Sequence, residues 1–140
     1  MAGENYIPSK IITYSKYGEM MDKMVSQLKE EKFTKIYAPP RGGIPLAVHL
    51  SYHLDIPLIT SEQILSNMNK WTPDDRLLVV DDIINNGRTI SMLSELLKIR
   101  KIKHFTAVLF YKPTAVYKPH LFIEETKDWV IFPWQKKRGL

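Results

Sequence analysis

The stretch that decides the fold is residues 77–89, Leu-Leu-Val-Val-Asp-Asp-Ile-Ile-Asn-Asn-Gly-Arg-Thr. Its first four residues are apolar, which predicts a strand that is buried on both faces, as in a parallel sheet. Two adjacent carboxylates, Asp81 and Asp82, end this strand. A turn at residues 85–87 and a helical pattern follow, so the stretch predicts a strand, a short loop and a helix start.

The turn after the two acids has the composition of an anion-binding loop. A helix start offers free backbone N–H groups and the positive end of the helix dipole, and Gly87 lets the backbone approach an anion closely. Carboxylates such as Asp81 and Asp82 suit Mg²⁺ or sugar hydroxyls. The residues therefore indicate a site for a phosphorylated ligand, and an ordinary strand-turn-helix connection is the alternative that they leave open.

The same run resembles the ribose-phosphate signature of type I phosphoribosyltransferases: an apolar strand, two acids, two apolar residues, Asp-Thr-Gly, any residue and Thr. The positions that match are Asp81, Asp82, Ile83, Ile84, Gly87 and Thr89. The resemblance implies that Asp81 and Asp82 hold the ribose hydroxyls of phosphoribosyl pyrophosphate (PRPP), directly or through Mg²⁺. It assigns the 5′-phosphate of PRPP to four loop residues, Asn86, Gly87, Arg88 and Thr89.

A second glycine turn, Arg41-Gly42-Gly43, follows a predicted strand at residues 35–38. Turns at the carboxyl ends of parallel strands open onto the same edge of the sheet. We therefore expect both glycine turns to face one ligand, although such a tripeptide is also common in plain turns. The phosphoribosyltransferases hold pyrophosphate at this place. The resemblance assigns that role to Arg41 and Gly42 and implies a cis peptide at Pro40–Arg41.

A third signal lies in Lys112, which follows a predicted strand at residues 103–111, and in the aromatic stretch that begins at Trp129. These parts look like the base-recognition segments of bacterial xanthine–guanine phosphoribosyltransferases. The resemblance implies that Lys112 donates to O6 of a purine, that Trp129 stacks on the ring, and that the Val130 main chain meets the 2-position edge. The alternative is a solvated Lys112 and tryptophans that belong to the core.

Two departures from the family pattern bear on chemistry. Ile131 and Phe132 stand where the xanthine–guanine enzymes have a polar pair, which leaves the choice among guanine, xanthine and hypoxanthine open. Asn85 stands where the family usually has an Asp near purine N7, and an amide cannot exchange a proton at neutral pH. The resemblance implies a 6-oxopurine phosphoribosyltransferase of purine salvage that uses Mg²⁺, and Asn85 favours a PRPP- or nucleotide-binding regulatory module as the alternative.

Bulk properties agree with one α/β domain over residues 1–140, built on a central parallel sheet. Apolar residues make up 44% of the chain, and its net charge is +5. The chain has no cysteine, so it offers no disulfide framework or thiolate metal site. No apolar run is long enough to span a membrane and no signal peptide is evident, which predicts a cytoplasmic protein. No nucleic-acid-binding pattern appears, and the family resemblance implies a homo-oligomer, a dimer or tetramer.

Hydrophobic patterning predicts the other elements. Helices are expected at residues 16–31, with Ser15 as the N-cap, from residue 44 onward, and at residues 89–101. Further strands are expected at residues 56–60 and 129–132. His49 and His53 are four residues apart, but no third ligand is nearby in the sequence, so they are interpreted as surface residues. Residues 61–75 are a candidate lid, and residues 112–140 a base-recognition hood and tail.

Overall fold

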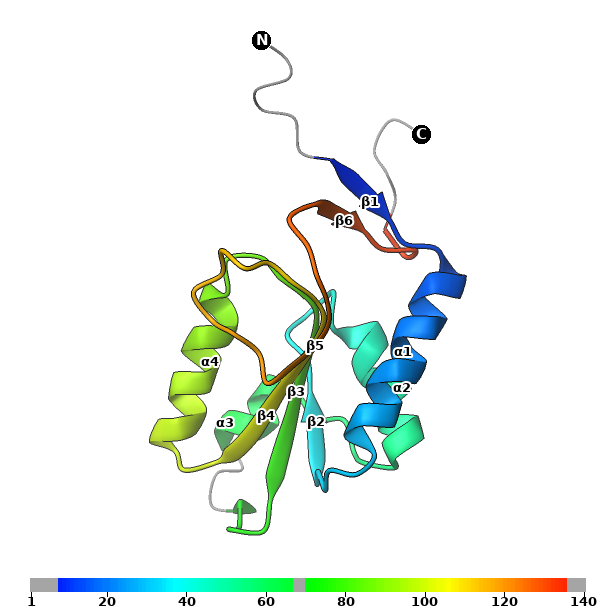
Figure 1. The fold of residues 1–140 in the computed structure, drawn as a ribbon. Helices are drawn as coiled ribbons and strands as arrows, with labels where there is room; N and C mark the ends of the chain where they lie inside the picture. The colour runs from blue at the N-terminus through cyan, green and yellow to red at the C-terminus, as the bar shows by residue number, and fades with distance from the viewer. Residues whose placement is uncertain (1–7, 67–69, 136–140) are drawn as a thin grey trace.

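A computed structural model describes residues 8–66 and 70–135 of the chain. Six strands and four helices follow one another in this described part (Figure 1). Their bounds are β1 Ser9–Ile11, α1 Tyr14–Leu28, β2 Lys35–Tyr37, α2 Ile44–Leu54, α3 Ser61–Ser66, β3 Arg76–Ile84, α4 Arg88–Ile99, β4 Lys103–Tyr111, β5 Leu121–Glu125 and β6 Trp129–Ile131.

The main sheet has four strands in the order β2-β3-β4-β5, and each neighbouring pair is parallel. The longest pairing joins β3 to β4, from Arg76 opposite Lys103 to Ile84 opposite Tyr111. β3 is therefore an interior strand, as its unbroken apolar run predicts. The predicted α/β fold with a central parallel sheet is confirmed.

Helices cover both faces of the sheet, and successive residues of β3 alternate between them. Leu78 and Val80 belong to the core cluster that α1 and α2 complete, whereas Leu77 and Val79 belong to the cluster that α3 and α4 complete. Figure 1 shows α1 and α2 on one side of the sheet and α3 and α4 on the other. Residues 77–80 carry apolar side chains without a break, because neither face of the strand meets water there.

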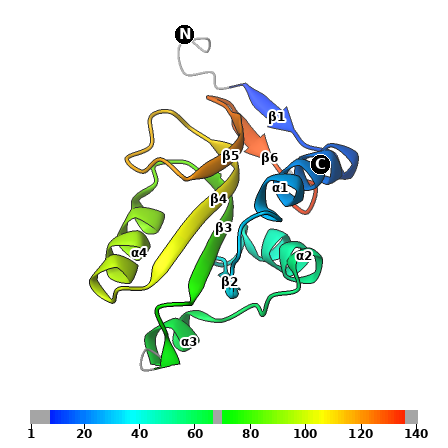
Figure 2. The same ribbon diagram turned by 60° about the horizontal axis from the view of Figure 1, so that its bottom comes forward.

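A separate two-stranded sheet joins segments from opposite ends of the described chain. β1 and β6 pair in parallel, with Ser9 opposite Trp129 and Ile11 opposite Ile131. Both views show the two strands side by side beyond the carboxyl end of the main sheet (Figures 1 and 2). This small sheet fixes the position of Trp129, which the sequence singled out as a candidate base-binding residue.

The first helix begins two residues earlier than predicted, because Thr13 and not Ser15 is its N-cap. The Thr13 side chain accepts a hydrogen bond from the Lys16 N–H at 3.1 Å. Ile12 precedes this cap, and both Ile12 and Tyr17 are buried in one core cluster. Apolar residues at these two positions form the hydrophobic staple that sets where a helix starts.

Other predicted boundaries differ from the structure in informative ways. The strand predicted at residues 56–60 is wrong: the segment makes only an isolated bridge between Ile36 and Leu58. β5 was not predicted, and β3 continues past Val80 to Ile84, so both acids lie on the strand itself. The apolar pattern of α2 also predicts that Val48 faces the core, but this residue is 42% exposed.

Candidate active site

The Arg41-Gly42-Gly43 turn packs directly on the carboxyl half of β3. A Cβ atom built at Gly42 would lie 2.4 Å from Oδ2 of Asp82, and one at Gly43 would lie 2.8 Å from the carbonyl oxygen of Val80. Neither position has room for a side chain. The two segments that the sequence assigned to pyrophosphate and to ribose are therefore in contact, with the side chain of Arg41 exposed and the peptide Pro40–Arg41 in the cis form.

The two acids sit in an environment that disfavours two negative charges. Asp82 is buried and Asp81 is half-buried. Asp81 accepts the Asp82 N–H at 2.9 Å, and Asp82 accepts the Ile83 N–H at 2.8 Å. Burial raises the pKa of Asp81, and the charge of Asp82 raises it further; burial likewise raises the pKa of Asp82. Such a pair favours a ligand that brings positive charge or hydroxyl donors.

Mg²⁺ fits this donor set as an ion coordinated jointly by the protein and a substrate. Within residues 8–66 and 70–135, no group of three or more His, Cys, Asp or Glu residues could hold a metal ion. Mg²⁺ commonly takes one or two carboxylates and completes its shell with water and substrate phosphates. Asp81 and Asp82 supply such carboxylates, so the site suits a metal that arrives together with a phosphorylated substrate.

The predicted phosphate loop, residues 86–89, lines an open hollow at the start of α4. The hollow has a volume of about 240 Å³ and is lined by Asp81 and residues 83–90. Gly87 has a φ of +79°, the left-handed conformation that favours glycine. The Arg88 N–H donates to Oδ1 of Asn86 at 2.9 Å. Asn85, Asn86, Arg88 and Thr89 are all exposed at this hollow.

Lys112 is tied to the end of β3 by its main chain. Its N–H donates to the carbonyl oxygen of Ile84 at 3.1 Å, immediately before Asn85. Its ammonium lies 5.7 Å from the centroid of the Trp129 ring, within the range of a cation–π interaction. The structure thus brings the candidate base-binding lysine next to both the phosphate loop and the candidate stacking tryptophan.

The two tryptophans of the C-terminal stretch have different environments. Trp129 is 57% exposed, and its neighbour Val130 is buried in β6. Trp134 instead packs against the core. Its ring is stacked on that of Phe132, with 5.2 Å between ring centroids, and lies edge-on to that of Tyr17, with 5.1 Å between ring centroids. Trp129 is therefore accessible to a ligand, whereas Trp134 is partly buried against the core to which Phe132 belongs.

Residues of the connection between β4 and β5 lie against the phosphate loop, a feature absent from the sequence analysis. The Val116 N–H donates to the carbonyl oxygen of Asn86 at 2.8 Å. A Cβ atom at Gly87 would lie 3.0 Å from the backbone N of Tyr117. No sequence signal reveals these contacts, because they join segments about thirty residues apart through tertiary packing alone.

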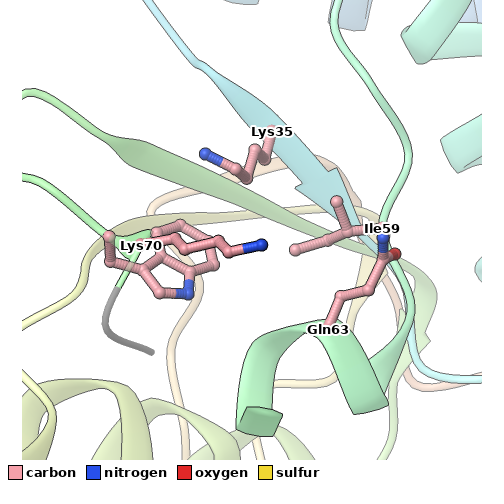
Figure 3. Close-up of a pocket in the computed structure, with 5 residues that line it drawn as sticks. Lys35, Ile59, Gln63 and Lys70 are labelled. Carbon is pink, nitrogen blue, oxygen red and sulfur yellow. The ribbon is translucent and has the colours of Figure 1, made fainter. Parts of the chain in front are cut away.

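The predicted lid spans residues 61–75, and the structure describes its beginning and its end. The segment begins as α3. Near its end, the Trp71 ring packs against Lys35, whose Nζ lies 4.6 Å from the ring centroid. Residues 67–69 lie outside the described residues. A hollow of about 140 Å³ lies between α3, Ile59 and Lys35, the first residue of β2, and none of its lining residues belongs to a glycine turn (Figure 3). This hollow is separate from the phosphate loop.

His49 and His53, which the sequence left as surface residues, are exposed on α2. The Nδ1 atom of His49 lies 3.2 Å from the Tyr17 hydroxyl. No helix in the described residues combines the length and apolar character that a bilayer crossing needs.

Comparisons with known proteins agree with this geometry. The family model of the phosphoribosyl transferase domain matches residues 12–137. The xanthine-guanine phosphoribosyltransferase of Idiomarina loihiensis is 27% identical over 124 residues, with 77% of this chain and 74% of that protein covered.

Two solved structures share the fold. The purine phosphoribosyltransferase of Pyrococcus horikoshii has a TM-score of 0.79 and 24% identity, covering 96% of this chain and 98% of that one. The xanthine-guanine-hypoxanthine phosphoribosyltransferase of Helicobacter pylori has a TM-score of 0.77 and 22% identity, covering 92% and 93%. Because the family model spans nearly the whole chain, the protein belongs to the phosphoribosyl transferase domain family, a family of pentosyltransferase enzymes.

Proposed function

We propose that this protein transfers the phosphoribosyl group of PRPP to a 6-oxopurine, guanine, xanthine or hypoxanthine, in purine salvage. The products are a nucleoside 5′-monophosphate and pyrophosphate. The observation that carries the proposal is the convergence of three segments at one sheet edge. Gly42 contacts Asp82, and the Lys112 N–H bonds to Ile84 just before the phosphate loop. The activity named for the Idiomarina loihiensis relative supports it.

PRPP would lie across the carboxyl end of β3. The backbone N–H groups at the start of α4 and the hydroxyl of Thr89 suit its 5′-phosphate. The carboxylates of Asp81 and Asp82 suit its ribose hydroxyls and would also hold Mg²⁺, which would supply positive charge beside the pyrophosphate. The guanidinium of Arg41, exposed beside Gly42, suits the pyrophosphate itself.

The reaction joins a purine ring nitrogen to C1 of the ribose as the bond from C1 to the pyrophosphate oxygen breaks, and the proton that the purine ring gives up passes to solvent. Positive charge develops on the ribose and negative charge on the leaving group. The protein's part is to position both substrates and to stabilise these charges. Arg41 would stabilise the leaving pyrophosphate, and Asp81 and Asp82 would hold the ribose in place beside the base.

The base site selects an oxo group over an amino group at C6. An ammonium can donate a hydrogen bond but cannot accept one, so Lys112 favours guanine, xanthine or hypoxanthine over adenine. The exposed Trp129 ring offers a flat face for a planar base. The Val130 main chain would meet the 2-position edge.

Asn85 supports a second candidate, a PRPP- or nucleotide-binding regulatory module with little turnover. An amide at this position can hydrogen-bond purine N7 but cannot take or give a proton at neutral pH. Proton transfer by a positioned group is typically worth about 10²–10⁴-fold in rate. A chain that keeps both phosphate-binding loops and lacks this group retains binding and loses much of the rate.

The test is turnover of Mg²⁺–PRPP with guanine, xanthine, hypoxanthine and adenine in parallel, for the wild type and Asn85→Asp. We expect nucleotide from at least one 6-oxopurine and none from adenine. A carboxyl group at position 85 restores a proton acceptor, so Asn85→Asp should raise kcat on the order of 10²-fold. PRPP binding should be similar in both proteins.

Asn86→Asp is the matched control, because it adds the same charge one residue along. Its carboxylate would lie beside the candidate 5′-phosphate site, so it should weaken PRPP binding without raising kcat. Tight PRPP binding without product from any base would favour the regulatory module. Absence of turnover, of PRPP binding and of binding to a purine nucleoside 5′-monophosphate would overturn both candidates.

A further inference from the structure

The connection between β4 and β5, residues 112–120, runs along the outer side of the phosphate loop. We name this segment the strap. In both views it lies beside the loop that leads from β3 into α4 (Figures 1 and 2). It is bonded to the end of β3 by Lys112, whose N–H donates to Ile84, and to the phosphate loop by Val116, whose N–H donates to Asn86 at 2.8 Å.

Strap and phosphate loop are in direct contact at Gly87. A Cβ atom there would lie 3.0 Å from the backbone N and 3.2 Å from the Cβ of Tyr117. The backbone of Gly87 is also in the left-handed conformation, with a φ of +79°. Tyr117 therefore packs against the turn that leads into α4, and it is not among the residues that line the hollow there.

The far end of the strap is fastened to the sheet through Thr106, a residue of β4 that is only 1% exposed. Its hydroxyl lies 3.1 Å from the Tyr117 hydroxyl and accepts the His120 N–H at 3.1 Å. The Thr106 N–H donates to Nδ1 of His120 at 2.9 Å, so Nδ1 carries no proton. Burial lowers the pKa of His120, which keeps that nitrogen an acceptor.

We propose that Tyr117, whose hydroxyl is held by Thr106, is a positioning residue for the loop that binds the 5′-phosphate of PRPP. The identity of the ligand rests on the proposed function. The side chain of Tyr117 does not need to touch the substrate. It fixes the backbone of Gly87 before the ligand arrives, so the phosphate meets N–H groups that are already oriented, and binding costs less conformational entropy.

The test compares Tyr117→Phe, which removes only the hydroxyl, with the wild type. We expect the Kd and KM for Mg²⁺–PRPP to rise about tenfold, while kcat at saturating PRPP changes less than about twofold. Thr106→Val should show the same split, and Thr106→Ser, which restores a hydroxyl, should bind PRPP like the wild type. Tyr52→Phe is the control, since Tyr52 is 85% exposed on α2.

A second readout needs no substrate. Amide hydrogen exchange at residues 86–89 should be faster in Tyr117→Phe than in Tyr52→Phe, because the loop loses its outer support. Faster exchange in a protein that binds no PRPP would uphold the positioning role and refute the proposed function. Unchanged exchange together with unchanged PRPP affinity in both Tyr117→Phe and Thr106→Val would overturn the inference.

Discussion

Gly42 and Asp82 show how closely the site is packed at the level of single residues. The carboxylate of Asp82 is 6% exposed and lies under Gly42, where any Cβ atom would come within 2.8 Å of all three atoms of the carboxyl group. The backbone of the Arg41 turn can reach the end of β3 only because this side chain is missing. Glycine therefore sets the distance between the candidate pyrophosphate and ribose sites.

Replacing Gly42 by Ala should abolish most activity while the fold survives. The new methyl group must displace either Asp82 or the turn, and misplacement by about 1 Å can cost on the order of 10²-fold in rate. Turnover with Mg²⁺–PRPP and the circular dichroism spectrum together check this. Gly18→Ala is the control: nothing lies within 4 Å of a Cβ atom there. In the middle of α1 it should stabilise the fold by about 0.5–1 kcal/mol. Wild-type turnover in Gly42→Ala would contradict the account.

The sequence predicted the strand, the turn and the helix start of residues 77–89 because their signal is local. Acids, a glycine turn and a helix start follow one another within thirteen residues, 77–89. The contacts that join the loop to Lys112 and Tyr117 have no such signal. They depend on how far β4 runs beside β3 and on the path of the strap, which only the folded chain determines.

At the scale of elements, the start of β3 depends on one carboxylate. Asp75 accepts hydrogen bonds from the Thr34 hydroxyl at 2.8 Å, the Lys35 ammonium at 2.8 Å and the Thr72 N–H at 2.9 Å. It thereby joins the turn before β3 to the beginning of β2. The hydrogen bond from Lys35 and then that from Thr72 lower the pKa of Asp75 to about 2.

Asp75→Asn should destabilise the protein in a pH-dependent way. The pKa of Asp75 is lower in the folded protein than in the unfolded chain, so its contribution is full above the ordinary value of 3.8 and is lost as the pH falls toward 2. We expect the free energy of unfolding to fall by about 1–2 kcal/mol at neutral pH, and the difference from the wild type to become smaller below about pH 3. Urea unfolding at several pH values measures this. Asp74→Asn, at an exposed neighbour, is the control, and a pH-independent loss in Asp75→Asn would refute the mechanism.

Element prediction succeeded where the hydrophobic pattern was strong and failed where pairing decided the outcome. β3 and β4 are each nine residues long and deeply buried, and their apolar runs predict them as strands. The segment at residues 56–60 is apolar too, but its neighbour β2 has only three residues and offers it a single bridge at Ile36. β5 has half-buried residues on both faces, so no alternation marks it as a strand.

For the whole molecule, the parallel order β2-β3-β4-β5 explains why one edge collects the candidate site. Each strand ends at the same side, so the Arg41 turn, the phosphate loop and Lys112 follow neighbouring strands there. The sequence could predict this edge from the alternation of strands and helices. It could not predict the pairing of β1 with β6, because these strands come from opposite ends of the chain and each has only three residues.

Grouping the acids at this edge has a cost for the stability of the whole protein. Burial raises the pKa of Asp81, with the charge of Asp82 adding to the effect. The folded protein therefore holds a proton at this pair more tightly than the unfolded chain does. By linkage, this pair stabilises the fold less and less as the pH rises above the ordinary carboxyl value of 3.8.

Asp81→Asn should consequently make the protein more stable and less active. The amide keeps the shape of the side chain and has no charge to bury. The free energy of unfolding should therefore exceed that of the wild type by an amount that grows from about pH 4 to about pH 8, reaching on the order of 1–2 kcal/mol. Thermal unfolding across this range checks the stability, and turnover with Mg²⁺–PRPP checks the activity. Asp22→Asn, which removes an exposed charge from α1, controls for net charge. With saturating Mg²⁺–PRPP, the wild type should become the more stable of the two proteins. Only the wild type has both carboxylates to hold the metal-bound substrate, so only it gains the full binding energy. A variant that is less stable than the wild type at about pH 8 would show that the acids belong to the structural core and are not a cost carried for the site.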